Sequence, residues 1–226
     1  FLFCLSLGAA GLEWIGRLFV GGRGRNLNVQ GDLIYMSSKL ADEKGVVDFP
    51  DPPFAHALFS TTRFAWLWLI IRLYLSYNWL NSGLGKLGNP AWMQGGTALK
   101  GFWTAAVHVP ESGSPPIVFG WYRTFLQFML DSSAYTWFGP LIAIGETVVG
   151  LLLLLGAFTG IVATLGSFMN FNFMLAGSAS VNPVFFLLQV LLILAWKVAG
   201  WYGLDRWLLP RLGTPWQRGT LAAGDR

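Results

Sequence analysis

The chain has 226 residues, of which 54% are hydrophobic and only 12% are charged. Soluble domains carry about 25% charged residues, so this composition argues against a soluble fold and indicates an integral membrane protein. The net charge of +4 is better explained by basic residues flanking apolar segments than by a nucleic-acid surface, and the single cysteine, Cys4, excludes an internal disulfide and a cysteine-ligated zinc site within this chain.

The first segment, Phe1–Val20, is apolar apart from Glu13 and Arg17, which are four residues apart and face the same side of a helix. We predict a transmembrane helix here, and we interpret it as the tail of a truncated first helix or of an uncleaved signal anchor. A polar loop rich in Gly, Asp and Pro follows. Residues 1–57 are therefore expected to form an extra N-terminal helix and loop.

The second predicted span is Phe54–Asn81, with its continuous apolar part at Phe64–Leu80. A long insertion follows over residues 83–135. Within it, Gly96–Val107 is predicted to lie as an interfacial helix. Ile117–Leu130 is too short for a span, so we expect it to be re-entrant or to lie on the surface.

Three further spans are predicted at Trp137–Ala157, Ile161–Ala176 and Val184–Tyr202. The first of them is long enough to cross roughly 30 Å of hydrocarbon at 1.5 Å per residue. The connections between the three are short, which favours antiparallel neighbours. The sequence thus predicts an all-α integral membrane protein, with a helical bundle over residues 58–210 and a basic polar tail over 211–226.

The distribution of basic residues predicts the orientation. With the N-terminus outside, eleven Lys and Arg residues lie on the inner side, and only Lys86, Lys100 and Arg123 lie on the outer side. We therefore expect a multi-pass protein of a bacterial or archaeal cytoplasmic membrane, with its C-terminus inside and the insertion outside.

Two charged residues lie deep in these spans. Arg72 is about 12 Å below the predicted outer end of its span at Leu80, and Glu146 is about 13 Å below Trp137. Because an unpaired charge is expensive in hydrocarbon, we predict an Arg72–Glu146 ion pair. The pair can be catalytic, next to a quinone pocket, or a purely structural clamp between helices.

Other polar side chains fall in the same outer half of the bilayer, and one helical face carries Arg72, Ser76, Trp79, Gly83 and Lys86. This arrangement suits a flat apolar molecule with carbonyl groups, such as a quinone. Hydrogen bonds between helices explain the amides equally well. The candidate substrate- or quinone-binding residues are Trp79, Lys86, Asn170, Asn172, Gln189 and Arg123.

No haem, metal or nucleotide site is predicted, and a quinone is expected only as a substrate. Residues 83–88 read GLGKLG, but no strand–helix–strand pattern surrounds this glycine motif. The predicted topology places the only histidines, His56 and His108, on opposite sides of the membrane, which excludes a haem bound between them.

The segments RLYLSYNWLNSGLGKL (Arg72–Leu87), IAIGETVVGLLLLLGAFTG (Ile142–Gly160), MNFNFMLAG (Met169–Gly177) and GLDRWLLP (Gly203–Pro210) resemble the DoxX/DoxD family. The stretches GNPAWMQGGTALKGFW and YRTFLQFML resemble its DoxD branch, the large membrane subunit of thiosulfate:quinone oxidoreductase. The resemblance covers roughly residues 65–210. It implies a four-helix antiparallel DoxX-like bundle with Arg72, Lys86 and Glu146 as motif residues.

The resemblance implies that the chain passes electrons from a small sulfur anion, such as thiosulfate, to quinone, with basic residues outside attracting the anion. The first 57 residues lie outside the match, and such oxidoreductases also require a small subunit. The alternative is a non-catalytic accessory subunit of a larger respiratory or photosynthetic complex. A small-solute transporter is disfavoured, since no inverted repeat is evident. The expected partners are the lipid bilayer and other protein subunits, not nucleic acid.

Overall fold

The computed structural model describes residues 51–214 and 217–218, and these residues are mainly helical. The only strands among them, β1 (Gly213–Thr214) and β2 (Gln217–Arg218), form one short antiparallel pair. The predicted all-α class is therefore confirmed for the described residues. The predicted first helix and most of its loop, and the end of the basic tail, lie outside them. The helices are α3 (Pro53–Ser60), a 3-10 turn (Thr62–Phe64), α4 (Ala65–Leu87), α5 (Pro90–Met93), α6 (Thr97–Val107), α7 (Gly120–Asp131), α8 (Tyr135–Leu155), α9 (Thr159–Leu175), α10 (Asn182–Leu194) and α11 (Asp205–Leu212).

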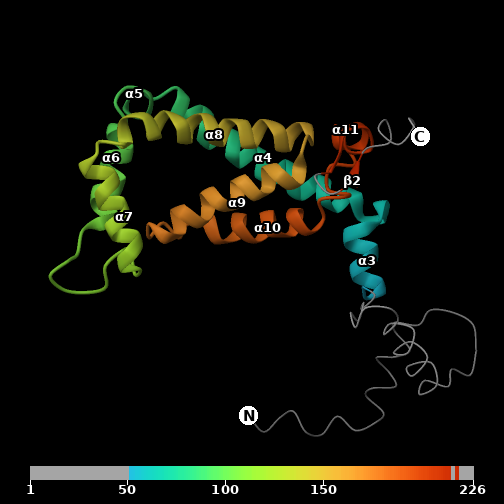
Figure 1. Cartoon of the computed structure of the whole chain (residues 1–226), viewed down its shortest axis with the longest axis horizontal. Coiled ribbons are helices and arrows are strands. Elements are labelled where there is room, and N and C mark those ends of the chain that lie inside the picture. Colours follow the sequence, from blue (N-terminus) through green and yellow to red (C-terminus); the bar gives the residue numbers. More distant parts are fainter. Residues whose placement is uncertain (1–50, 215–216, 219–226) are drawn as a thin grey trace, which may run out of the picture. The chain divides into compact units, whose positions relative to one another are not determined.

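The chain divides into two units at His56, and the described residues from Ala57 onwards belong to the second. Within the second unit, α4, α8, α9 and α10 are the central helices, and α4 contacts α8, α8 contacts α9, α9 contacts α10, and α10 contacts α4. Figure 1 shows α6 and α7 crossing one end of the central helices, while α11 lies at the other end. The candidate site lies near the α6 end.

The turn between α8 and α9 has the predicted hairpin geometry. Helix α8 ends at Gly156, whose φ of 63° lies in the left-handed region that favours glycine. Helix α9 starts three residues later, after Phe158 at φ 51°. The N–H groups of Phe158 and Thr159 donate to the carboxylate of Asp205 at 2.6 and 2.9 Å, so a residue from α11 caps the start of α9.

Small residues let α4 and α8 approach closely. Ser76 Oγ on α4 donates to the carbonyl of Gly150 on α8 at 2.8 Å. A Cβ at Gly150 would stand 2.7 Å from the backbone N of Leu80, and a Cβ at Gly83 would stand 2.6 Å from the backbone N of Thr147. Both glycines therefore lie where the two backbones meet, as is common where helices pack through small residues.

Two apolar clusters form the core. One lies among the central helices and contains Trp68, Leu75 and Leu153, and the other joins α6 and α7 to α8 and α9. Met169 and Phe173 on α9 pack against both clusters. The α6–α7 end is thus continuous with the central core through α9.

Helix ends differ from the predicted spans at two places. Helix α4 continues to Leu87, beyond the predicted end at Asn81, and α10 ends at Leu194, well before Tyr202. The two helices predicted in the insertion are present as α6 and α7. A further short helix, α11, begins in the predicted bundle and ends within the predicted tail.

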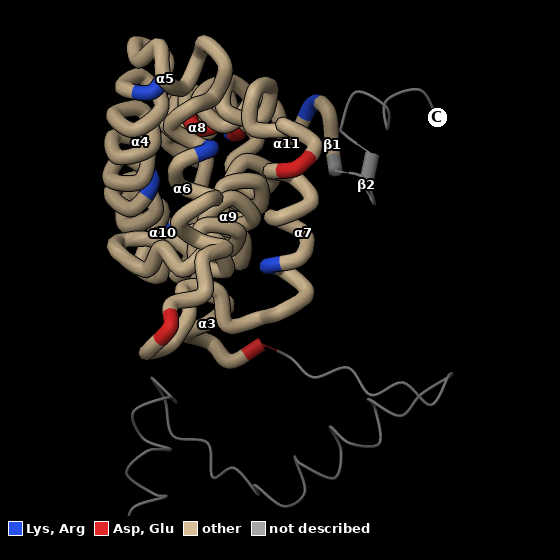
Figure 2. The backbone as a smooth tube through the Cα atoms, turned by 90° about the vertical axis from the view of Figure 1, so that its left-hand side faces the viewer, with Lys and Arg blue, Asp and Glu red and all other residues tan. Residues whose placement is uncertain are grey.

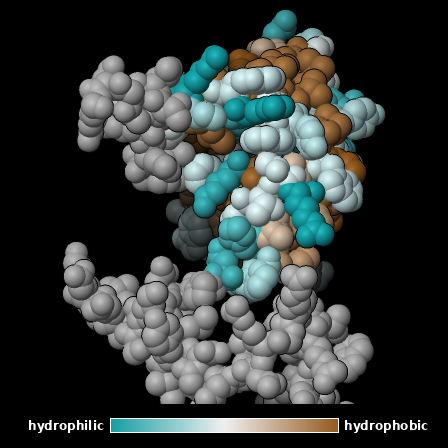
Figure 3. All heavy atoms as spheres, turned by 90° about the vertical axis from the view of Figure 1, so that its right-hand side faces the viewer, coloured by the Kyte–Doolittle hydropathy of each residue, from teal (hydrophilic) through white to brown (hydrophobic). Residues whose placement is uncertain are grey.

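Many large apolar side chains on the outer faces of the central helices are exposed. Of the described helices, Tyr135–Leu155 is long and apolar enough to cross a membrane, and Pro53–Ser60 with Thr62–Leu87 passes the same test only as one span bent by 65°. Charged residues are scattered sparsely along the backbone (Figure 2). The end that carries α11 presents hydrophilic side chains, with hydrophobic ones at the margin (Figure 3).

Candidate functional site

A buried carboxylate with a lysine partner forms the centre of the site. The Nζ atom of Lys86 lies 2.5 Å from Oε2 of Glu146, and the Ser82 hydroxyl donates to the same oxygen at 2.8 Å. Lys86 also donates to Ser82 Oγ at 2.6 Å. The side chain of Glu146 is 2% exposed and that of Lys86 is 19% exposed. The lysine therefore joins a buried negative charge to the surface of the unit.

These three residues line a cavity of about 540 Å³, a size typical of small-molecule sites. Its walls come from α4, α5, α6, α8, α9, and the start of α10 with the turn before it. The Trp92 ring centroid is 5.1 Å from Lys86 Nζ, close enough for a cation–π interaction. Polar groups in the rest of the wall come from Asn78, Trp79, Asn81, Asn170, Ser178, Ser180 and Asn182.

Trp79 lines this cavity, but its Nε1 atom does not offer a donor to it. The residue is 4% exposed, and its Nε1–H is buried from solvent and has no hydrogen-bond partner among the described residues. The cavity therefore meets other atoms of this side chain, and the indole N–H is an unsatisfied buried donor. Asn170, also in the wall, donates to Gln189 Oε1 at 2.7 Å. Gln189 thus lies behind Asn170 and outside the cavity lining.

The predicted Arg72–Glu146 ion pair is wrong. Arg72 is buried about two turns from the start of α4, where its NH1 and NH2 donate to the carbonyls of Ala199 and Tyr202 at 3.3 and 2.7 Å. Asp205, the residue that caps α9, attracts it electrostatically. A Cβ at Gly156 would overlap the guanidinium. Arg72 therefore links the end of α8 to the segment between α10 and α11.

The error comes from the register assumed between the two helices. The prediction sets Leu80 level with Trp137, but α4 continues to Leu87 and Leu80 lies against Gly150 of α8. Ser82 and Lys86 therefore lie alongside Glu146. Ser82 lies ten residues after Arg72, which is about 15 Å along a helix. Glu146 consequently meets the residues near the end of α4 rather than Arg72.

The predicted face of α4 is present, because Arg72, Ser76, Trp79 and Gly83 are all buried along it.

Asn172 and Arg123, which were also predicted to bind the substrate, lie outside the ion-pair cavity. Asn172 lines a different, apolar cavity.

The backbone carbonyl oxygen and the side-chain oxygen of Asn172 accept hydrogen bonds from the Tyr122 hydroxyl at 3.1 and 3.2 Å. Burial raises the pKa of Tyr122 to about 12, which keeps its phenol protonated as the donor.

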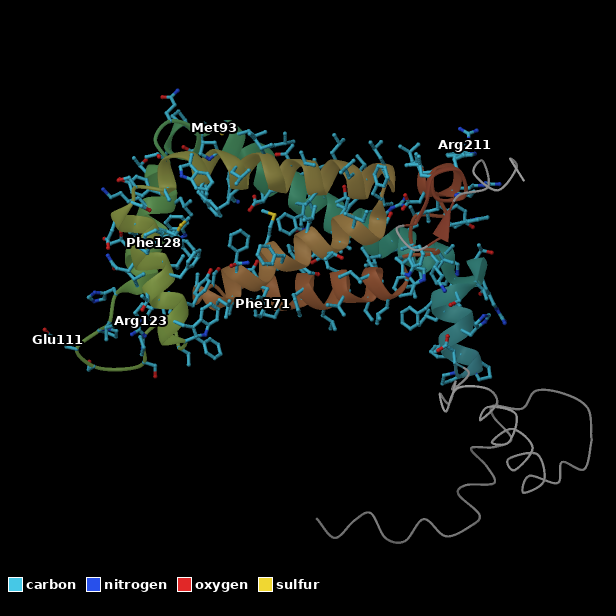
Figure 4. The ribbon with its side chains drawn as sticks, viewed as in Figure 1. Met93, Glu111, Arg123, Phe128, Phe171 and Arg211 are labelled. Carbon is cyan, nitrogen blue, oxygen red and sulfur yellow. The ribbon has the colours of Figure 1, made fainter. Side chains whose placement is uncertain are left out.

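Arg123 binds the loop before α7 rather than the ion-pair cavity. Its NH2 donates to the carbonyl of Ile117 at 2.6 Å, and Figure 4 shows Arg123 beside that loop. It lines neither cavity. The third outer cation, Lys100, lies 5.2 Å from the Tyr135 ring centroid. Neither residue is brought to the Lys86–Glu146 pair, so the predicted role of Arg123 in binding has no geometric support.

Sequence reasoning missed Ser82, Trp92 and the polar turn before α10. The available signal was the i, i+4 spacing of Ser82 and Lys86, which places both on one helix face with Gly83 beside them. The turn residues, such as Ser178 and Asn182, had no such signal, since only the fold brings them to the end of α4.

The arrangement can bind an oxygen-bearing planar group and exchange protons with it. Lys86 is a donor for carbonyl oxygens, and the Glu146–Ser82–Lys86 chain connects hydrogen-bonding groups through which a proton can move. In the described residues, no group of three or more His, Cys, Asp or Glu side chains is placed to hold a metal ion.

Comparison with known proteins gives no assignment. No family model matches the chain, and neither a curated protein nor a solved structure matches it significantly.

Proposed function

We propose that the chain is a membrane-embedded, quinone-reactive subunit, similar in role to the DoxX/DoxD proteins that its motifs resemble. In this proposal the central helices form the DoxX-like antiparallel bundle and cross the bilayer, and α6 and α7 lie at its outer face. The exposed apolar side chains of α8 and α9 support this placement, because soluble monomers rarely expose extended apolar surface. Lys100 and Arg123 lie on α6 and α7, in keeping with a weakly basic outer side.

The observation that carries the proposal is the Lys86–Glu146 pair in the wall of a cavity. An ionisable residue buried in a membrane bundle is by default a candidate for a functional site. A quinone head fits the chemistry of the wall: its carbonyl oxygens can accept hydrogen bonds from Lys86 and from an amide such as Asn81, and its ring can stack on an aromatic side chain such as Trp92.

The proposed reaction is the oxidation of a small sulfur anion outside the membrane, such as thiosulfate, coupled to quinone reduction. Two thiosulfate anions joined through a new S–S bond release two electrons. One quinone takes up those two electrons with two protons and becomes a quinol. Glu146, Ser82 and Lys86 would relay the protons to the quinone oxygens. The sulfur step takes place on this chain by direct transfer or on a partner subunit.

A reduction assay tests this function. The full chain in lipid nanodiscs, with and without candidate small subunits, would be supplied with thiosulfate and a quinone analogue. We expect Glu146→Gln and Lys86→Met each to lower the rate by about 10²-fold or more, as loss of a proton-transfer group does. Glu111→Gln and Lys197→Met make the same chemical changes at exposed positions outside the cavity and should leave the rate unchanged.

Unchanged rates in both cavity variants would contradict the proposal.

The second candidate function, a non-catalytic accessory subunit, is favoured by one observation. Helix α7 exposes Trp121, Phe125 and Phe128 on one side, which suits contact with another protein. Absence of activity in all preparations, together with stoichiometric co-purification in a larger complex, would favour that candidate.

A further inference from the structure

A second cavity lies next to the ion-pair cavity, and the proposed function does not use it. It is bounded by α6, α7, α8 and α9 and has a volume of about 540 Å³. Its lining is almost entirely apolar. Apart from the indole of Trp103, the polar side chains there are Tyr122 and Asn172, which are hydrogen-bonded to each other. This apolar cavity therefore offers a ligand contact surface but few free hydrogen-bonding groups.

The two cavities share a wall. Leu99 and Phe102 on α6 and Phe173 on α9 line both of them. These three side chains stand between the two cavities, so a ligand whose head lies against Lys86 and Glu146 would reach the apolar cavity if one of them rotates aside. Neither cavity alone has this combination of a charged wall and a long apolar wall.

The apolar cavity opens between α8 and α9. The exposed side chains of Leu141, Leu165 and Phe168 form its rim, and each is more than half exposed. In the membrane placement proposed above, this rim faces lipid. A chain in the cavity can therefore leave laterally into the hydrocarbon without passing through water.

We propose that the apolar cavity binds the isoprenoid tail of a quinone whose head lies in the ion-pair cavity. This inference rests on the proposed function and adds to it the place where the tail of the quinone lies. An isoprenoid chain gains little free energy by exchanging lipid for an apolar protein wall. The main effect of the cavity is orientation, because a tail held on one side of the head fixes which edge of the ring faces Lys86.

Photolabelling locates the tail directly. The probe is a quinone with a diazirine on its isoprenoid tail, added to the full chain in nanodiscs, and the labelled residues are identified by mass spectrometry. We expect labels on the α8 and α9 residues of the apolar cavity, and we expect an excess of tail-free quinone to remove them. A prenyl alcohol with the same diazirine but no quinone head should label these residues at least about tenfold less.

A variant that fills the apolar cavity, compared with a matched control variant outside it, tests the position of the tail. Gly145 lines the apolar cavity, and a Cβ there would meet only Met169 atoms at 3.6 and 3.7 Å. Gly145→Leu should remove the cavity labels while tail-free quinone still binds, which also shows that the variant folds. Gly85→Leu, on α4 where a Cβ would meet nothing within 4 Å, should leave the labels unchanged.

The outcomes separate the two proposals. If tail-free quinone binds but the probe labels other surfaces, or if the prenyl alcohol labels the cavity equally well, the tail inference is overturned and the proposed function stands. If no quinone binds, with or without a tail, both are overturned.

Discussion

At the residue scale, the Lys86–Glu146 pair joins two groups in unequal surroundings. Glu146 is almost fully buried, whereas the Lys86 side chain reaches the surface. Removing the partner of a buried charge leaves that charge without compensation, and this costs more free energy than the pair itself contributes. The lysine is thus the partner whose loss should matter more to folding.

We expect Lys86→Met to lower the free energy of unfolding by about 3 kcal/mol, since it leaves the Glu146 carboxylate buried with only Ser82 as a partner. Glu146→Gln should cost less, because Ser82 can still donate to the amide oxygen and Lys86 can turn towards water. The double variant should recover most of the loss. Unfolding in detergent by denaturant titration measures all three, and simple additivity of the single effects would refute the coupling.

Arg72 and Asp205 have a different role. Arg72 bonds to carbonyls near the end of the unit that carries α11, and Asp205 caps α9 there. Neither residue lines the ion-pair cavity. We assign them to holding the helix ends together rather than to chemistry.

At the element scale, the contact between α4 and α8 depends on glycine. A Cβ at Gly83 would overlap Thr147 backbone atoms, while Gly85, two residues later on the same helix, has nothing within 4 Å of its would-be Cβ.

Gly83→Ala should therefore destabilise the protein by about 1–3 kcal/mol, because the two helices must separate. Gly85→Ala should stabilise it by about 0.5–1 kcal/mol, since alanine is the better helix former. Thermal unfolding followed by circular dichroism compares the two variants. Shifts of the same sign and size would contradict the packing described for this pair of helices.

The helices differ in how far the sequence predicted them. Helix α8 was expected at Trp137–Ala157 and lies at Tyr135–Leu155, because a continuous apolar run ending in glycine marks both its type and its end. Helix α4 was expected to end at Asn81. It continues to Leu87, in keeping with the helical face that includes Gly83 and Lys86, and so brings Ser82 and Lys86 to Glu146, a contact between helices that local sequence does not reveal.

Helix α10 shows the opposite error. The apolar sequence continues to Tyr202, but the helix ends at Leu194, and the carbonyls of Ala199 and Tyr202 accept hydrogen bonds from Arg72. The site was likewise predictable only in part. Its polar residue types and the buried face of α4 were predictable, whereas the pairing of the charges depended on the register between α4 and α8.

At the scale of the whole molecule, the proposed membrane placement makes a topological prediction. In a Cys4→Ser background, Glu111→Cys, before α7, and Arg211→Cys, on α11, should react with a water-soluble maleimide from opposite sides of the membrane. Leu165→Cys, on the exposed face of α9, should stay unlabelled because lipid covers it. Labelling in sealed vesicles measures this, and rapid reaction at residue 165 would contradict the placement.

The account depends most on quinone binding beside Lys86 and Glu146. The most direct measurement is equilibrium titration of the full chain in nanodiscs with a tail-free quinone, followed by quenching of tryptophan fluorescence, since Trp79 and Trp92 line the cavity. We predict saturable binding that Lys86→Met weakens about tenfold or more, as loss of a charged hydrogen bond does, and that Lys197→Met leaves unchanged. Equal dissociation constants for the two variants, or no saturable binding at all, would contradict it.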